Sequence, residues 1–215
     1  METWFTRRNI LVFALTLAGV GTGTYLYQRQ SEQKEQAGKA VLFKAQQAFE
    51  SEFQALSEEE RGVGVELDVD SKFSKTVSEL KELLKRSDST SRVRFEAALR
   101  LGSLYLDYRR PDQAVEFFKT GAGDASSPFQ KATAEFLLGT AQERNRMFHE
   151  ARVSFERGIG RNVEALKADF LLGMVRVSLQ LKDSAQAKNF SDRLMRELPK
   201  SKAAEIAKSL VKDIK

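Results

Sequence analysis

Residues whose side chains commonly do chemistry are few in this 215-residue sequence. His149 is the only histidine and there is no cysteine, so the ligands of soft metal sites, disulfides and thiolate nucleophiles are missing. The acidic residues 58–60 are consecutive and sit in a helical, solvated context rather than converging as a pair. Gly62 and Gly64 are not followed by the Gly-Lys-Ser/Thr of a phosphate-binding loop. We therefore predict that the protein is not an enzyme and that it binds no cofactor, metal or small-molecule substrate.

The densest basic cluster consists of Arg92, Arg94, Arg100, Arg109 and Arg110. As a phosphate-binding patch it lacks the interleaved aromatic residues on which nucleic-acid bases stack. The chain has a formal net charge of +5, but its 35 Lys and Arg residues are interleaved with 30 acidic ones. This pattern predicts an ion-paired helical surface and no nucleic-acid partner.

A recurring sequence pattern indicates the helices of this protein. The pattern is Leu-Gly, then Ala, then Phe. Its copies are Leu101, Gly102, Ala114 and Phe118, then Leu138, Gly139, Ala151 and Phe155, then Leu172, Gly173 and Ala185. The first two copies are 37 residues apart, and the second and third are 34 apart. Phe190 falls near the third aromatic place, which predicts a slightly longer turn around residues 181–184. A period of this length indicates stacked helix–turn–helix units, in which small residues allow neighbouring helices to approach closely.

This pattern resembles the tetratricopeptide repeat, in which Leu-Gly lies in the first helix of a pair and Ala and Phe lie in the second. Aligned in this way, residues 91–200 hold three repeats, at about 95–128, 132–165 and 166–199. The Gly-x-Gly segments 121–123 and 158–160 are predicted to cap the second helices of the first two repeats. Residues 201–215 are predicted to form an amphipathic helix that covers the last apolar face. The predicted fold class is all-α, an α-solenoid of antiparallel helix pairs.

The resemblance implies that residues of the first helices line the concave side of the stack. Counted from the repeat starts, these residues are Leu99, Ser103, Leu106, Phe136, Thr140, Glu143, Phe170, Met174 and Val177. Chaperone-docking members of the family hold a peptide carboxylate with Lys and Asn at such places, and this chain has neither there. We therefore expect a mainly apolar groove that suits an amphipathic helix or an extended hydrophobic segment. In the alternative interpretation, Phe136 and Phe170 are buried in the stack.

The N-terminal region contains an uncharged apolar run at residues 10–27, preceded by Arg7 and Arg8. A helix of this length just crosses a bilayer, which predicts a transmembrane anchor, with residues 1–9 as a short cytoplasmic segment. The rival interpretation is a cleaved signal peptide, because small residues at 21–23 offer a processing site. Residues 28–39 are polar and are expected to form a linker or a solvated helical stalk.

Residues 40–90 are predicted to form an irregular leading helix pair ahead of the repeats. Apolar residues recur at helical spacing in 42–56 and again in 73–84. Between these stripes, residues 63–69 alternate as an extended segment would, and Asp70 or Ser71 could cap the second helix.

The whole arrangement of anchor, stalk and repeats resembles bacterial proteins of the YfgM-like group, ancillary factors of the Sec translocon that cooperate with periplasmic chaperones. This resemblance implies a single-pass protein of the bacterial inner membrane with its C-terminal domain in the periplasm. Its expected partners are other proteins, namely the translocon, a chaperone or unfolded client segments. Two alternatives remain open: an assembly factor for an envelope machine such as a pilus or secretion apparatus, and a cleaved, secreted regulatory module.

Overall fold

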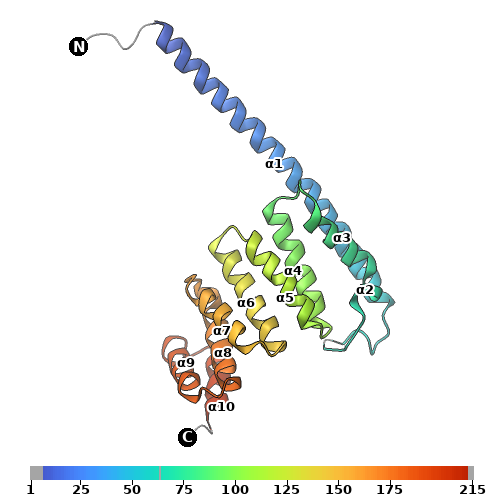
Figure 1. Ribbon diagram of the computed structural model, residues 1–215, viewed down its shortest axis with the longest axis vertical. Coiled ribbons are helices and arrows are strands. Elements are labelled where there is room, and N and C mark those ends of the chain that lie inside the picture. The colour runs from blue at the N-terminus through green and yellow to red at the C-terminus, as the bar shows by residue number, and fades with distance from the viewer. Residues whose placement is uncertain (1–6, 63, 213–215) are drawn as a thin grey trace, which may run out of the picture.

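The computed structural model describes the backbone of residues 7–62 and 64–212 and the side chains of residues 27–62 and 64–212. Its helices are α1 (Arg7–Ala55), α2 (Val69–Lys72), α3 (Ser74–Lys85), α4 (Ser91–Asp107), α5 (Pro111–Asp124), α6 (Pro128–Arg144), α7 (Phe148–Ile159), α8 (Glu164–Gln180), α9 (Ser184–Glu197) and α10 (Lys202–Val211). No strand occurs in this part of the chain. The helices from α3 to α10 follow one another as a stack of hairpins (Figure 1), so the predicted all-α fold class is confirmed.

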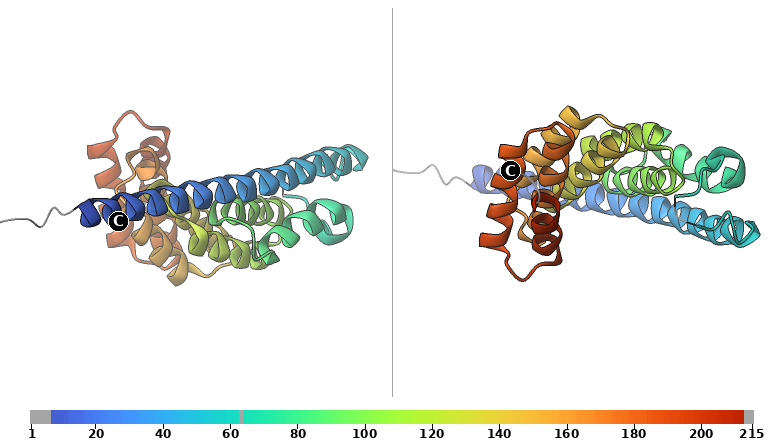
Figure 2. Two further views of the ribbon diagram at one scale, coloured as in Figure 1. Left: turned by 90° about the horizontal axis from the view of Figure 1, so that it is seen from above. Right: turned by 90° about the horizontal axis from the view of Figure 1, so that it is seen from below.

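The first helix, α1, is a single unbroken rod of 49 residues, and it stays unbroken in the views from above and below (Figure 2). Only its C-terminal half lies beside α3 and α4, while its N-terminal half projects away from the stack (Figure 1). Contact with α4 includes an ion pair between Glu35 and Arg92 at 3.5 Å, and the helices pack closely at Gly38, where an added Cβ would lie 2.7 Å from the side chain of Val93. The predicted stalk at 28–39 is therefore helical and continuous with the first helix of the leading pair.

The predicted anchor at 10–27 coincides with this projecting half. Its backbone is helical, but its side chains, Tyr27 excepted, lie outside the described residues. Among the helices that the structure describes, none combines the length and the apolarity needed to cross a membrane.

The leading pair consists of α1 and α3, which pack through aromatic residues. The rings of Phe49 and Phe73 lie 5.4 Å apart and nearly parallel, and Phe73 is fully buried. The segment between the helices is irregular up to Asp68, whose carboxylate accepts the backbone N–H of Ser71 at 3.3 Å. Asp68 thus caps the short helix α2, which contains Asp70 and Ser71. The helix with the apolar stripe is α3, and its cap is Phe73, which makes no side-chain capping bond, so the predicted cap at Asp70 or Ser71 is wrong.

The pairs α4–α5, α6–α7 and α8–α9 are joined by the same turn. In each turn, a backbone N–H donates to the carbonyl five residues earlier: Arg110 to Tyr105 at 2.8 Å, Met147 to Gln142 at 2.8 Å, and Asp183 to Ser178 at 2.9 Å. The residue before each donor has a left-handed backbone: Arg109 (φ 57°), Arg146 (φ 61°) and Lys182 (φ 59°). These bonds close the ends of the first helices. The turns are spaced by 37 and then 36 residues, so the third pair lies two residues later than the Leu-Gly pattern predicts.

In the first two pairs, one aromatic ring fills the space opposite one glycine. Phe118 and Phe155 are fully buried. A Cβ at Gly102 would lie 2.5 Å from the Phe118 ring, and one at Gly139 would lie 2.6 Å from the Phe155 ring. Only glycine allows the rings this close, so the Gly and Phe of each copy are a packing pair.

The third pair uses a different packing, which corrects the predicted register. Ala185 is exposed, and Ala187, the fourth residue of α9, takes the fully buried place that Ala114 and Ala151 hold in α5 and α7. By the same count, Val175 stands where the first two pairs have glycine, and Ser191 stands where they have phenylalanine; both are fully buried. A larger residue in one helix is thus matched by a smaller one in the other, which keeps the core filled.

Other glycines of the pattern also pack rather than cap. Gly173 lies against the far side of the Phe155 ring, where an added Cβ would come within 2.8 Å. Gly121 and Gly158 are buried inside α5 and α7, and Gly158 faces the Phe170 ring. Helix α5 continues through residues 121–123 and ends at Asp124, with Ala125 as its cap, so the predicted cap there is wrong. Gly160 does cap α7.

The last helix, α10, covers the end of the stack. Ala203, Ala204 and Ala207 are buried against α8 and α9, in a cluster that includes Leu171 and Leu194. Small residues on this face let α10 lie close to the preceding pair, and its polar residues face solvent.

Candidate protein-binding groove

The residues predicted to line the groove divide into two groups. In α4 and α6, Leu99, Ser103, Phe136, Thr140 and Glu143 are half-buried, as groove residues should be, whereas Leu106 is buried at 7% exposure. In α8, all three predicted residues are core: Phe170 is 1% exposed, and Met174 and Val177 are fully buried.

The register of the third pair explains why the α8 residues were misassigned. With the turn spacing of 36, the places of Phe136, Thr140 and Glu143 recur at Leu172, Arg176 and Leu179. These three side chains are half-buried. The predicted groove face therefore continues across α8 through residues that the Leu-Gly pattern misplaced by two positions. Equal turn spacing would have revealed them, but the turns carry Arg and Lys where glycine is the usual marker of a left-handed residue.

Phe136 and Phe170 have different roles. The Phe170 ring is buried against Gly158 and meets the Phe136 ring edge-on, with centroids 5.7 Å apart at 88°. The Phe136 ring is also 6.2 Å from that of Phe155, but it keeps part of its surface open. Phe170 thus belongs to the core, while Phe136 contributes to both the core and the groove.

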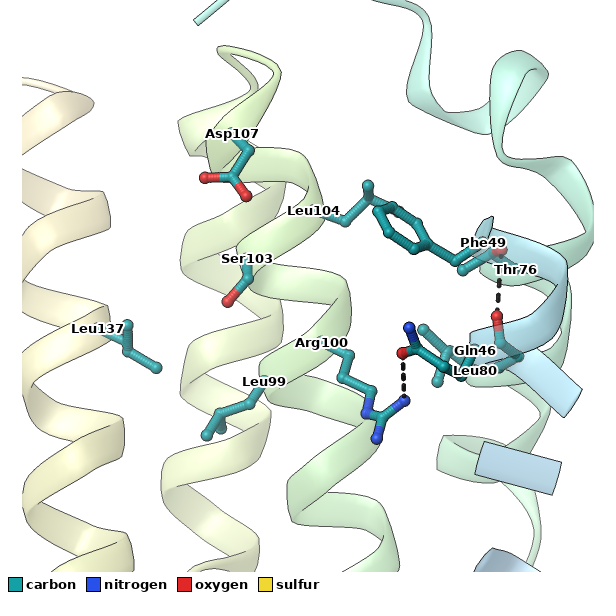
Figure 3. Close-up of a pocket in the computed structure, with 11 residues that line it drawn as sticks. Gln46, Phe49, Thr76, Leu80, Leu99, Arg100, Ser103, Leu104, Asp107 and Leu137 are labelled. Atoms are coloured by element: carbon teal, nitrogen blue, oxygen red, sulfur yellow. Dashed lines mark hydrogen bonds between the residues drawn. The ribbon is translucent and has the colours of Figure 1, made fainter. Parts of the chain in front are cut away.

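A cavity of about 310 Å³ opens over α4, on the face that carries Leu99 and Ser103. We call it the apolar hollow; it is lined by Ala45, Gln46, Phe49, Thr76, Leu80, Leu99, Arg100, Ser103, Leu104, Asp107 and Leu137. As Figure 3 shows, α4 forms its floor, α1 and α3 stand on one side, and Leu137 of α6 faces in from the other. The leading pair therefore contributes one wall, which the repeat pattern alone did not predict.

Most polar groups of the apolar hollow are engaged within the fold. One Nη of Arg100 donates to Oε1 of Gln46 at 3.2 Å (Figure 3) and to the carbonyl of Leu42 at 3.4 Å. The hydroxyl of Thr76 donates to Glu52 at 2.6 Å. The carboxylate of Asp107, in contrast, has no hydrogen bond or ion pair among the described residues. Desolvation raises the pKa of Asp107, and the positive charge of Arg144 opposes this rise.

A second cavity of about 570 Å³ lies farther along the same face, at the C-terminal ends of α6 and α8. We call it the arginine hollow; it is lined by Thr140, Glu143, Arg144, Arg146, Phe148, Arg176 and Gln180. Arg176 binds Glu143 with two parallel hydrogen bonds, Nε to Oε1 and Nη2 to Oε2, both 2.7 Å long. These bonds to Glu143 raise the pKa of Arg176 and fix its guanidinium in place.

The two hollows supply apolar surface, guanidinium donors and the carboxylate of Asp107, which has no partner among the described residues. His149 is an exposed residue near the start of α7. Within the described residues, no three His, Cys, Asp or Glu side chains come together as metal ligands would. Such a surface can bind a polypeptide segment by shape, burial and charge.

Comparison with known proteins bears on the fold. No protein-family model matches the chain, and no curated protein matches it. Among solved structures, the chain is similar to one described as "Crystal structure of MamA", with a TM-score of 0.51 and 20% sequence identity. That match covers 67% of this chain and 83% of the other. At this identity the likeness concerns the fold alone. Together with the three identical turns, it supports a helical-repeat fold of the tetratricopeptide type.

Proposed function

We propose that the protein is a scaffold that binds a segment of another protein along the concave face of its helical repeats. The observation that carries this proposal is the alignment of Leu99, Phe136 and Leu172. They occupy one place on three successive first helices, and each keeps part of its apolar surface open. Half-exposed apolar side chains that recur on one face of successive helices point to an interaction site.

The apolar hollow suits side chains presented by a helix. Its 310 Å³ fall in the range of ligand-binding pockets in proteins. Leu99, Leu104 and Leu137 would contact an inserted aliphatic or aromatic residue. Ser103, which is small and half-buried, lets the backbone of a bound segment approach α4.

We further propose that residues 10–27 anchor the protein in the bacterial inner membrane, with the repeats in the periplasm. The uncharged run supports this idea, as does the projection of the N-terminal half of α1 away from the stack (Figure 1). An anchor would concentrate the groove near membrane-embedded partners. In this setting the protein would serve as an ancillary factor of the translocon or of a chaperone for exported proteins; the alternative is an assembly factor with one fixed partner in an envelope machine.

Photocrosslinking in intact cells tests the binding function. A photoreactive amino acid is placed at residue 137 in the apolar hollow and, as a control, at residue 153 on α7, where the native Val153 is 42% exposed. We expect crosslinks to other proteins from residue 137 and none from residue 153. Equal crosslinking from both positions would overturn the assignment of the groove. Many crosslinked proteins would favour a role with export clients, and one stoichiometric product would favour an assembly factor.

The location is tested separately. Carbonate extraction of membranes and sequencing of the mature N-terminus distinguish an uncleaved anchor from a cleaved leader. Recovery of a processed, extractable protein would reject the anchor, but it would not affect the proposal that the groove binds a protein segment.

A further inference from the structure

The arginine hollow and the apolar hollow lie over equivalent places of successive first helices. Ser103, Thr140 and Arg176 occupy the same place on α4, α6 and α8, since the repeat turns are 37 and 36 residues apart. Ser103 lines the apolar hollow, and the other two line the arginine hollow. A segment lying across the first helices therefore meets an apolar site over α4 and then a cationic site over α6 and α8.

The arginine hollow has an excess of positive charge. It contains three guanidinium groups and one carboxylate, that of Glu143. Glu143 is already bound by Nε and Nη2 of Arg176, which leaves the Nη1 donors of Arg176 free for a ligand. Arg144 makes one bond, to the carbonyl of Leu106 at 3.3 Å. Neither Arg144 nor Arg146 forms an ion pair with any of the described residues.

Arg146 adds a third guanidinium to the hollow. Its left-handed backbone (φ 61°) is shared by Arg109 and Lys182 in the other two turns, so this conformation belongs to the repeated turn. In the turn between α6 and α7 the residue at this place is an arginine, and it lines the hollow together with Phe148.

From this surface we infer that the bound segment is acidic and amphipathic: its apolar residues fill the apolar hollow, and its carboxylates contact Arg144, Arg146 and Arg176. This inference rests on the proposed binding function and specifies the chemistry of the partner.

Two fluorescent synthetic peptides test the inference. Both are 18-residue helices with one Leu/Phe stripe; one carries glutamates beside the stripe and the other carries lysines at the same places. Binding to the full-length chain in a non-ionic detergent micelle is followed by fluorescence anisotropy. We expect the glutamate peptide to bind at least tenfold more tightly than the lysine peptide. Raising the salt from 0.05 M to 0.5 M should weaken its binding severalfold, because salt screens exposed charges.

The chain offers a matched pair of variants. Arg146→Gly removes a guanidinium from the hollow and relieves its backbone, so we expect the variant to stay folded, and its thermal unfolding is measured alongside binding. Arg109→Gly makes the same change at the equivalent turn after α4, outside the hollow. We expect Arg146→Gly to weaken binding of the glutamate peptide about tenfold, the size of one charge-assisted hydrogen bond, and Arg109→Gly to leave it unchanged.

The outcomes separate this inference from the proposed function. If both peptides bind equally and Leu99→Asp abolishes both, the groove binds segments, but its preference for acidic ones is disproved. Tighter binding of the lysine peptide, or equal effects of Arg146→Gly and Arg109→Gly, would also overturn the inference. If neither peptide binds, the inference fails, and the crosslinking from residue 137 then decides whether the groove binds proteins at all.

Discussion

At the scale of single residues, the described part of the chain contains one buried acid with an unsatisfied carboxylate oxygen. Glu135 in α6 is 7% exposed, and its Oε2 has no hydrogen-bond partner among the described residues. The equivalent places in α4 and α8 hold Ala98 and Leu171, both fully buried. Burial raises the pKa of Glu135, and the charges of Arg157 and Arg161 oppose this rise only in part. Desolvation of this carboxylate therefore destabilises the folded state.

We predict that Glu135→Leu stabilises the protein at neutral pH by about 1–2 kcal/mol, since an unsatisfied buried group is removed. The folded-state pKa of Glu135 lies above its unfolded value, so its destabilising effect is absent at low pH and appears as the pH rises through the folded pKa. The gain from Glu135→Leu should therefore be larger at pH 8 than at pH 4.5. Urea denaturation at both pH values measures it, with exposed Glu150→Leu as the control. A gain that is the same at both pH values would contradict the pKa argument.

At the scale of the helix pair, packing between one ring and one glycine sets the distance between the two helices. This interaction could be predicted from the sequence in the first two repeats, because Leu-Gly and Phe recur there at equal spacing. The prediction failed in the third repeat, because Val175 replaces the glycine of the first helix and Ser191 replaces the phenylalanine of the second. A pattern of residue types cannot reveal such an exchange, since only the summed volume at the contact is constrained.

Gly139→Ala should destabilise the protein by about 1–3 kcal/mol, because the new Cβ would push the Phe155 ring out of its place. Gly123→Ala is the matched control. Gly123 is exposed in α5, with no atom within 4 Å of an added Cβ, so the change should stabilise by about 0.5–1 kcal/mol through helix propensity. Thermal unfolding of both variants tests the pair. Similar effects of the two changes would show that ring–glycine packing is unimportant.

The repeated turn gives another prediction at this scale. Arg109 and Lys182 have left-handed backbones, so Arg109→Gly and Lys182→Gly should each raise the free energy of unfolding by about 0.5–1 kcal/mol. Arg196→Gly, inside α9, should lower it by about 1 kcal/mol. Chemical denaturation compares the three variants. A loss of stability at both turns would mean that the cationic side chains contribute more to the helix ends than the backbone strain costs.

At the scale of the whole molecule, α1 has two environments along one helix. Residues 28–34 are almost entirely exposed, whereas Leu42, Ala45 and Ala48 are buried against the stack. A helical segment without tertiary packing is only marginally stable in water. We therefore expect tertiary packing to stabilise α1 only from about Gly38 onward.

Hydrogen exchange of the full-length chain in detergent micelles should show this boundary. We predict that the amides of residues 28–34 exchange within seconds to minutes, while those of residues 42–53 are protected nearly as well as α4. Peptide-level mass spectrometry reads both segments in one experiment. Uniform protection along residues 28–53 would reveal a further partner for the projecting segment, such as a second copy of the chain.

The sequence by itself determined that the chain is a stack of helix pairs, because apolar periodicity and recurring small residues are local properties of the pattern. It also determined much of the groove on α4 and α6, where the repeat spacing is regular. Only the tertiary structure decided the register of α8 and the burial of Phe170, Met174 and Val177. Only the structure joined α1 and α3 to the wall of the apolar hollow and placed Arg144, Arg146 and Arg176 together. The physical reason is that periodicity records which face of a helix is apolar, whereas register and convergence depend on how side chains of different helices fill a shared volume.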